Sequence, residues 1–61
     1  MKYAELKKKL TQNGCCKISE GTRHENWFSP ITQNIFQVGR HNTQDVHKGI
    51  LNKILKDAGI K

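Results

Sequence analysis

Apolar residues in this chain recur at helical spacing near both ends and follow a strand-like pattern in the middle. Near the N-terminus, three of them are separated by three and four positions: Tyr3, Leu6 and Leu10. This spacing is typical of one face of a helix, which we predict over 2–12. Gly14 ends it, because glycine accepts the left-handed backbone at a helix C-terminus. The lysines at 7–9 are then expected to lie mainly on the solvated side.

The middle of the chain predicts three short strands separated by turns. Its pattern favours strands over 15–20, 24–29 and 35–38. Gly21 opens the first turn, and Pro30 ends the second strand because proline has no backbone N–H to donate to a neighbouring strand. Since the strands follow one another closely along the chain, we predict an antiparallel meander.

A second helix is predicted near the C-terminus. Its apolar stripe has six members: Val46, Ile50, Leu51, Ile54, Leu55 and Ala58. We expect it over 44–57, with Asn42 or Thr43 as the N-cap and Asp45 in the first turn. Gly49 inside this helix costs up to about 1 kcal/mol relative to alanine, which a close contact with another element would explain.

These elements predict an α+β fold in the order helix, three strands, helix. Both apolar helix stripes can pack on one face of the sheet, which gives a two-layer sandwich and leaves the other face open. We expect a single domain over 1–61. Because the hydrophobic fraction is only 34%, we expect a small core, with marginal stability or stabilisation by a partner protein.

The charge of the chain is strongly basic. Lysine and arginine total 11 against 5 aspartate and glutamate residues, giving a formal net charge of +6. Such a field favours polyanions such as RNA, DNA, acidic proteins or anionic lipids. No stretch approaches the roughly 20 apolar residues of a membrane span. No apolar run follows the basic N-terminus, as it would in a signal peptide. We therefore expect a cytoplasmic protein without a membrane partner.

The two cysteines are adjacent, at Cys15 and Cys16. Neighbouring residues on a strand point to opposite faces, which argues against a structural disulfide between them. We expect one in the core and the other partly exposed. No second pair of cysteines or histidines has zinc-ligand spacing, so we predict no metal and no other cofactor.

The candidate chemistry centres on His24, which follows the turn that Gly21 opens. Cleavage of RNA without a metal needs a base for the ribose 2′-hydroxyl, and histidine suits this role because its ordinary pKa is about 6.5. Cations must also stabilise the charge that builds on the phosphate. Four side chains are candidates for this contact: Arg23, Lys17, Arg40 and His41. Backbone N–H groups at the start of the second helix, near Asn42, are a further candidate.

The residues alone leave other interpretations open. A lone histidine is more often structural or simply exposed than catalytic. His41 and His47 compete with His24, although His47 is expected on the solvent side of the helix. Glu25 would orient His24 only if their side chains met, whereas strand alternation points them apart. Of the aromatic residues at 27–28, one is expected in the core, and the other can stack on a base or pack against a partner.

Two stretches of the chain resemble a known family. The first is Gly14-Cys15 followed by Gly-Thr-Arg-His-Glu-Asn-Trp-Phe-Ser-Pro at 21–30. The second is Val-Gly-Arg-His at 38–41, continuing through Lys-Gly-Ile-Leu at 48–51 to Ile60. In this order and at these spacings, they resemble the HicA toxins of bacterial HicAB toxin–antitoxin modules, over nearly the whole chain.

The resemblance implies a fold like that of a double-stranded-RNA-binding domain, in agreement with the predicted order of elements. It also implies a ribonuclease that cleaves mRNA without a metal and blocks translation, and a HicB antitoxin that covers the active site. His24 matches the family's catalytic histidine. In the turn, where the family often has Ser or Ser-Asn, Thr22 keeps the hydroxyl and Arg23 adds a charge that can bind phosphate.

Three further positions depart from the family's pattern. Ser19 stands where many members have an arginine, which puts one RNA contact in doubt. Gly39 replaces a common proline, and Ile50 replaces a usual threonine. The leading hypothesis is a toxin ribonuclease with His24 as general base or acid. The alternatives are a non-catalytic RNA-binding module of the same fold, and a small basic subunit whose charge serves only an acidic partner.

Overall fold

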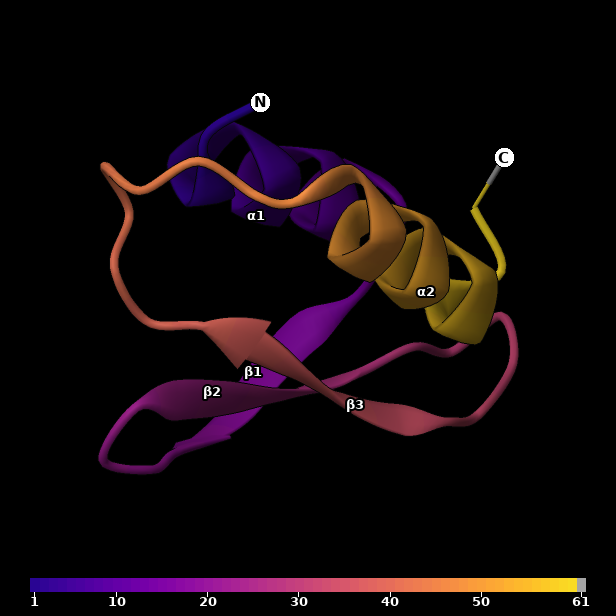
Figure 1. The fold of residues 1–61 in the computed structure, drawn as a ribbon. Helices are drawn as coiled ribbons and strands as arrows, with labels where there is room; N and C mark the ends of the chain where they lie inside the picture. The colour runs from indigo at the N-terminus through magenta and orange to yellow at the C-terminus, as the bar shows by residue number, and fades with distance from the viewer. Residues whose placement is uncertain (61) are drawn as a thin grey trace.

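The computed structural model describes residues 1–60 and confirms the predicted order of elements. Five elements follow one another along the chain: α1 (Tyr3–Gln12), β1 (Cys16–Glu20), β2 (His24–Phe28), β3 (Ile35–Gly39) and α2 (Lys48–Ala58). The strands form one antiparallel sheet in the order β1-β2-β3. Both helices lie on the same side of this sheet (Figure 1). The fold is therefore the α+β arrangement expected from the sequence.

The core lies between the sheet and the two helices. Alternate residues of β2 and β3 are buried: Glu25, Trp27, Phe36 and Val38. The helices and the connecting segments supply the rest: Tyr3, Leu6, Leu10, Cys15, Val46, Ile54 and Ala58. β1 lies at the edge of the sheet and its register with β2 shifts between Lys17 and Ser19, and all five of its residues are exposed. Of the two cysteines, Cys15 is buried and Cys16 is exposed, as their alternation predicts.

The second helix begins later than the sequence predicts. α2 starts at Lys48, so Asn42 and Thr43 are not its N-cap and Asp45 lies outside its first turn. The prediction was wrong because it treated the segment before Lys48 as free to continue the helix. That segment instead runs beside the start of the chain, where Lys2 pairs with Asp45 through an isolated bridge and an ion pair of 3.2 Å.

Main-chain hydrogen bonds join these two distant segments. Three of them connect 1–4 with 42–46: Tyr3 N to Gln44 O at 3.0 Å, Ala4 N to Asn42 O at 3.1 Å, and Val46 N to Met1 O at 2.9 Å. The first N–H groups of a helix have no acceptor within it. Here the carbonyl groups of the 42–46 segment accept two of them, so this segment caps α1 in place of a side chain.

Two glycines differ in what surrounds them. A Cβ atom on Gly39 would lie 2.6 Å from Cζ of Tyr3, so the ring of Tyr3 packs directly on this glycine. Gly49, by contrast, has no heavy atom within 4 Å of the place where its Cβ would stand, apart from its chain neighbours and the backbone of its own helix. No close contact therefore explains Gly49, whereas the Tyr3 ring excludes a side chain at Gly39.

Candidate functional site

His24 is the first residue of β2 and is exposed. It pairs with Gly39 of β3. Its side chain lies on the face of the sheet opposite to that of the buried Glu25. Asn26 follows on the same side as His24, and its Nδ2 donates to Oγ of Ser19 at 2.9 Å. His24 and Asn26 both line an open concavity of about 550 Å³. The imidazole is therefore accessible to a large ligand.

The turn before His24 is tightly closed. The N–H of Gly21 donates to the carbonyl oxygen of His24 at 2.7 Å, and a Cβ on Gly21 would approach that oxygen to 3.1 Å. Arg40, from the segment after β3, is tied to the same turn. Its N–H donates to Arg23 O at 3.3 Å, and its Nη1 donates to Thr22 O at 3.2 Å. The pairing of β2 with β3 thus gathers four of the predicted site residues.

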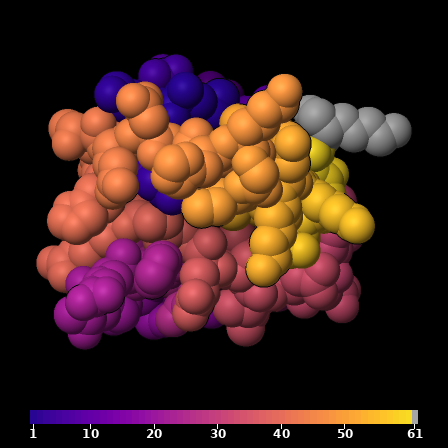
Figure 2. Space-filling view, viewed as in Figure 1, coloured from indigo at the N-terminus to yellow at the C-terminus, as the bar shows by residue number. Residues whose placement is uncertain are grey.

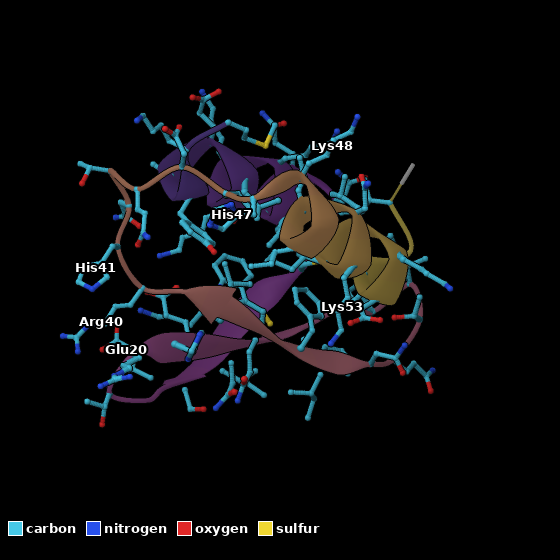
Figure 3. All side chains as sticks on the ribbon, viewed as in Figure 1. Glu20, Arg40, His41, His47, Lys48 and Lys53 are labelled. Atoms are coloured by element: carbon cyan, nitrogen blue, oxygen red, sulfur yellow. The ribbon has the colours of Figure 1, made fainter. Side chains whose placement is uncertain are left out.

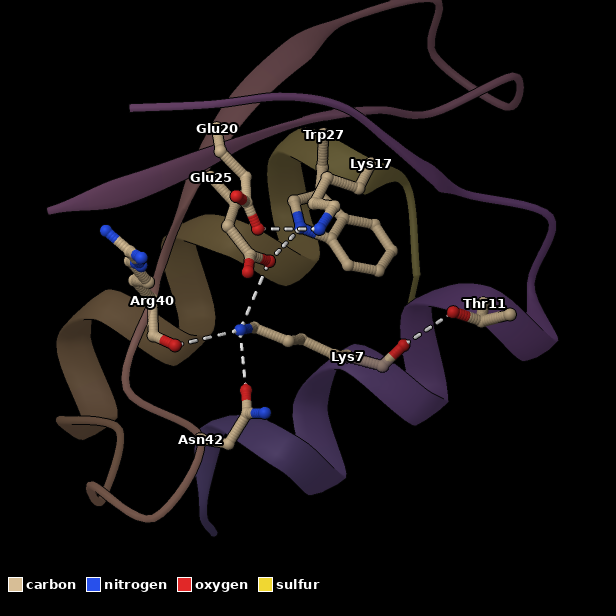
Figure 4. Close-up of polar contacts among 8 residues, drawn as sticks. All are labelled: Lys7, Thr11, Lys17, Glu20, Glu25, Trp27, Arg40 and Asn42. Carbon is tan, nitrogen blue, oxygen red and sulfur yellow. Dashed lines mark hydrogen bonds and ion pairs between the residues drawn. The ribbon is translucent and has the colours of Figure 1, made fainter. Parts of the chain in front are cut away.

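Lys17 lies nearby on β1 but is already paired. Its Nζ donates to Oε1 of Glu20 at 2.8 Å (Figure 4). This hydrogen bond raises the pKa of Lys17 and lowers the pKa of Glu20. The charge of Arg40 has a smaller effect, which opposes the rise at Lys17 and adds to the fall at Glu20. Figure 3 shows Glu20, Arg40 and His41 on the same side of the molecule. The sequence pattern did not predict that the Glu20 carboxylate would lie among these cations.

A second polar cluster lies on the helix side of the sheet, around Lys7. Its Nζ contacts Oε1 of Glu25 at 3.1 Å and Oδ1 of Asn42 at 2.7 Å. It also donates to the carbonyl oxygen of Arg40 at 3.3 Å, while the indole Nε1 of Trp27 donates to Glu25 at 3.0 Å (Figure 4). The side chain of Lys7 is only 13% exposed. The expectation that Lys7 faces the solvent is therefore wrong, because the buried Glu25 requires a cationic partner.

This Lys7 cluster holds Arg40 from the side opposite to the turn. Lys7 donates to the main-chain carbonyl group of Arg40, whereas the guanidinium of Arg40 donates to the carbonyl oxygen of Thr22. Glu25 is committed to Lys7 and Trp27 and does not orient His24, as strand alternation predicts. The sequence did contain a signal for this cluster. Glu25 occupies an inward position on β2, and a buried carboxylate implies a buried partner.

The remaining candidates are dispersed. His41 is exposed next to Arg40, and His47 is exposed at the N-cap of α2. The phosphate-binding N–H groups expected near Asn42 are not at a helix start, because α2 begins at Lys48. Figure 3 places Lys48 and Lys53 on α2, apart from Arg40 and His41.

The two neighbouring aromatic residues are now distinguished. Trp27 is in the core, where its indole N–H binds Glu25. Phe28 is half-buried on the other side of β2. Phe28 is therefore the one with surface left for a base or a partner.

Comparison with known proteins then decides the family. A family model described as the HicA toxin of bacterial toxin-antitoxin matches residues 3–60. The chain belongs to the HicA toxin family. The match spans all five elements and the whole cluster around His24. Membership identifies this HicA chain as the toxin of a toxin–antitoxin system and implies an antitoxin partner. Comparison with curated proteins and with solved structures gave no match.

Two further findings concern residues 1–60 of this HicA chain. No group of three or more histidine, cysteine, aspartate or glutamate side chains is placed to hold a metal ion in this part of the chain. None of the helices described there has the length and apolar character that crossing a membrane requires.

Proposed function

We propose that this HicA toxin is an endoribonuclease that cleaves mRNA and inhibits translation in the cytoplasm, with His24 as its general base and acid and without a metal or other cofactor. The observation that carries the proposal is the joining of His24, the 21–24 turn and Arg40. His24 is exposed at the end of this turn, and Arg40 is held at two points: its guanidinium donates to Thr22 O, and its main-chain carbonyl accepts from Lys7.

The reaction can be written for this arrangement. His24 takes the proton of a ribose 2′-hydroxyl as that oxygen attacks the adjacent phosphorus atom. The bond to the 5′-oxygen of the next nucleotide breaks, and the protonated imidazole returns a proton to that oxygen. The products are a 2′,3′-cyclic phosphate and a free 5′-hydroxyl.

The neighbouring groups would bind the phosphate as its charge increases. Arg23 precedes His24 in the turn and Arg40 is tied to that turn, so both are candidates for this contact, and Lys17 is a third candidate that must first leave Glu20. His41 and the Thr22 hydroxyl are further candidates for RNA contacts. A HicB-like antitoxin would neutralise this toxin by covering the same surface and excluding the phosphate backbone.

The test is cleavage of a defined RNA by His24→Ala in excess EDTA. Loss of a general base predicts a fall in rate of about 10²- to 10⁴-fold. His47→Ala is the matched control, because His47 is also exposed but lies at the start of α2. Undiminished cleavage by His24→Ala would remove this residue from the mechanism, and loss of wild-type cleavage in EDTA would indicate a metal enzyme. RNA that is bound but left uncut by the wild type would favour the non-catalytic module.

A further inference from the structure

β3 exposes one of its edges, since the sheet order is β1-β2-β3 and no strand among residues 1–60 lies beyond it. Hydrogen bonds flank its ladder with β2 at both ends: Ser29 N to Asn34 O at 3.0 Å and Arg40 N to Arg23 O at 3.3 Å. Hydrogen-bonded and non-bonded pairs alternate in an antiparallel ladder. Three residues therefore direct their N–H and C=O groups outward: Ile35, Gln37 and Gly39. Such an edge can pair with another extended chain.

A groove runs along this edge. The concavity of about 550 Å³ is lined by the three outward residues of β3 and by one face of α2. The α2 face consists of residues at helical spacing: Ile50, Lys53, Ile54 and Asp57. Figure 2 shows this side of the molecule, where α2 lies above β3. A free strand edge opposite a helix is the geometry that binds a peptide as an added strand.

The lining of the groove fits a peptide better than a nucleic acid. Ile35 is 64% exposed and Ile50 is 44% exposed, so both offer apolar surface that has no partner within residues 1–60. The α2 face carries one cation, Lys53, and one anion, Asp57. A phosphate backbone requires several cations, whereas a strand with alternating side chains requires apolar contact and main-chain pairing.

We propose that an extended segment of the antitoxin adds to β3 as a fourth strand and packs its alternate side chains against α2. The net charge of +6 favours an acidic partner, and a carboxylate of that segment would reach Lys53. Because His24 and Asn26 line the same concavity, the added strand would pass next to His24. The proposal depends on the antitoxin partner of the proposed function and not on ribonuclease activity.

The first test is amide hydrogen exchange of the full toxin, alone and bound to the purified antitoxin encoded with it. The outward amides of Ile35, Gln37 and Gly39 should exchange fast in the free toxin and become protected in the complex. A complex that leaves these three amides unprotected would overturn the proposal. Protection that appears in concentrated toxin without antitoxin would identify a second copy of this chain as the occupant and would also overturn it.

The second test uses substitutions in the groove. Gln37→Pro removes an outward N–H, which an edge strand tolerates because that group is not used in its own ladder. It should weaken antitoxin binding by about tenfold or more, whereas Gln37→Ala, which keeps the N–H, should change it little. Circular dichroism establishes that both variants are folded. Equal affinities of the two folded variants for the antitoxin would contradict the proposal.

Ile50→Ser tests the helix side of the groove without altering any strand. Loss of apolar contact there should weaken antitoxin binding by about tenfold. Ile31→Ser is the matched control, since Ile31 is 54% exposed but does not line the groove. Identical effects of the two serine variants would exclude the groove as the binding site. Because all these measurements follow binding, they remain decisive even if the chain proves not to cleave RNA.

Discussion

Glu25 is a carboxylate at a position of β2 where alternation would otherwise favour an apolar side chain. It is 7% exposed and has two partners, the ammonium of Lys7 and the indole N–H of Trp27. A buried ion pair is a weak source of stability by comparison with apolar packing, but breaking it leaves a charge without a partner. This single residue therefore explains why one lysine of α1 turns inward, away from the lysines beside it.

Lys7→Met should lower the free energy of unfolding by about 3 kcal/mol, because it leaves the Glu25 carboxylate buried and unpaired. Urea denaturation followed by circular dichroism measures this loss. Lys8→Met is the matched control, because Lys8 is an exposed neighbour on the same helix and should cost less than about 0.5 kcal/mol. Equal stabilities of the two variants would show that the Lys7 contacts contribute nothing.

Glu20 supports a second prediction at this scale. The hydrogen bond from Lys17 holds the pKa of Glu20 below its ordinary value of 4.5, so Glu20 should titrate at a midpoint below pH 4.5. Carbon-detected NMR titration of the side chain measures that midpoint, and Lys17→Met should move it upward. A midpoint unchanged by Lys17→Met would mean that the pair does not persist in solution. A lowered midpoint would mean that an RNA phosphate must compete with Glu20 for Lys17.

At the scale of the elements, the contact between α1 and β3 depends on Gly39. The ring of Tyr3 lies where a side chain on Gly39 would extend. Tyr3 is itself only 8% exposed, so its ring has little room to move. This packing gives a physical reason for a glycine at this position. It also fixes the end of β3 from which Arg40 continues.

Gly39→Ala should therefore destabilise the protein, by about 1 to 3 kcal/mol, because the added methyl group overpacks the Tyr3 contact. Gly49→Ala is the matched comparison, since it adds the same methyl group to a helix where no atom lies within 4 Å. It should be neutral or stabilising by up to about 1 kcal/mol. Thermal unfolding of both variants measures the difference. A Gly39→Ala variant as stable as Gly49→Ala would show that the Tyr3 ring yields without cost.

For the whole molecule, the order of elements could be predicted from the sequence because each element has its own period and its own terminating residue. The start of α2 could not, because carbonyl groups near Asn42 are held by N–H groups about forty positions earlier in the chain, a contact that no local pattern contains. The same division holds for the candidate site. The turn before His24 is local and was predicted, whereas the tie from Arg40 to Thr22 and the inward turn of Lys7 depend on tertiary pairing.

The capping of α1 by the 42–46 segment also has a consequence for biosynthesis. The N–H groups of Tyr3 and Ala4 wait for carbonyl acceptors that are made about forty residues later. Neither the first turn of α1 nor the Lys7 cluster that steadies Arg40 can be complete while the nascent chain lacks those acceptors. A ribosome that has not yet added the 42–46 segment would therefore carry an unfinished toxin, and the arrangement around His24 would be completed only after that segment has been made.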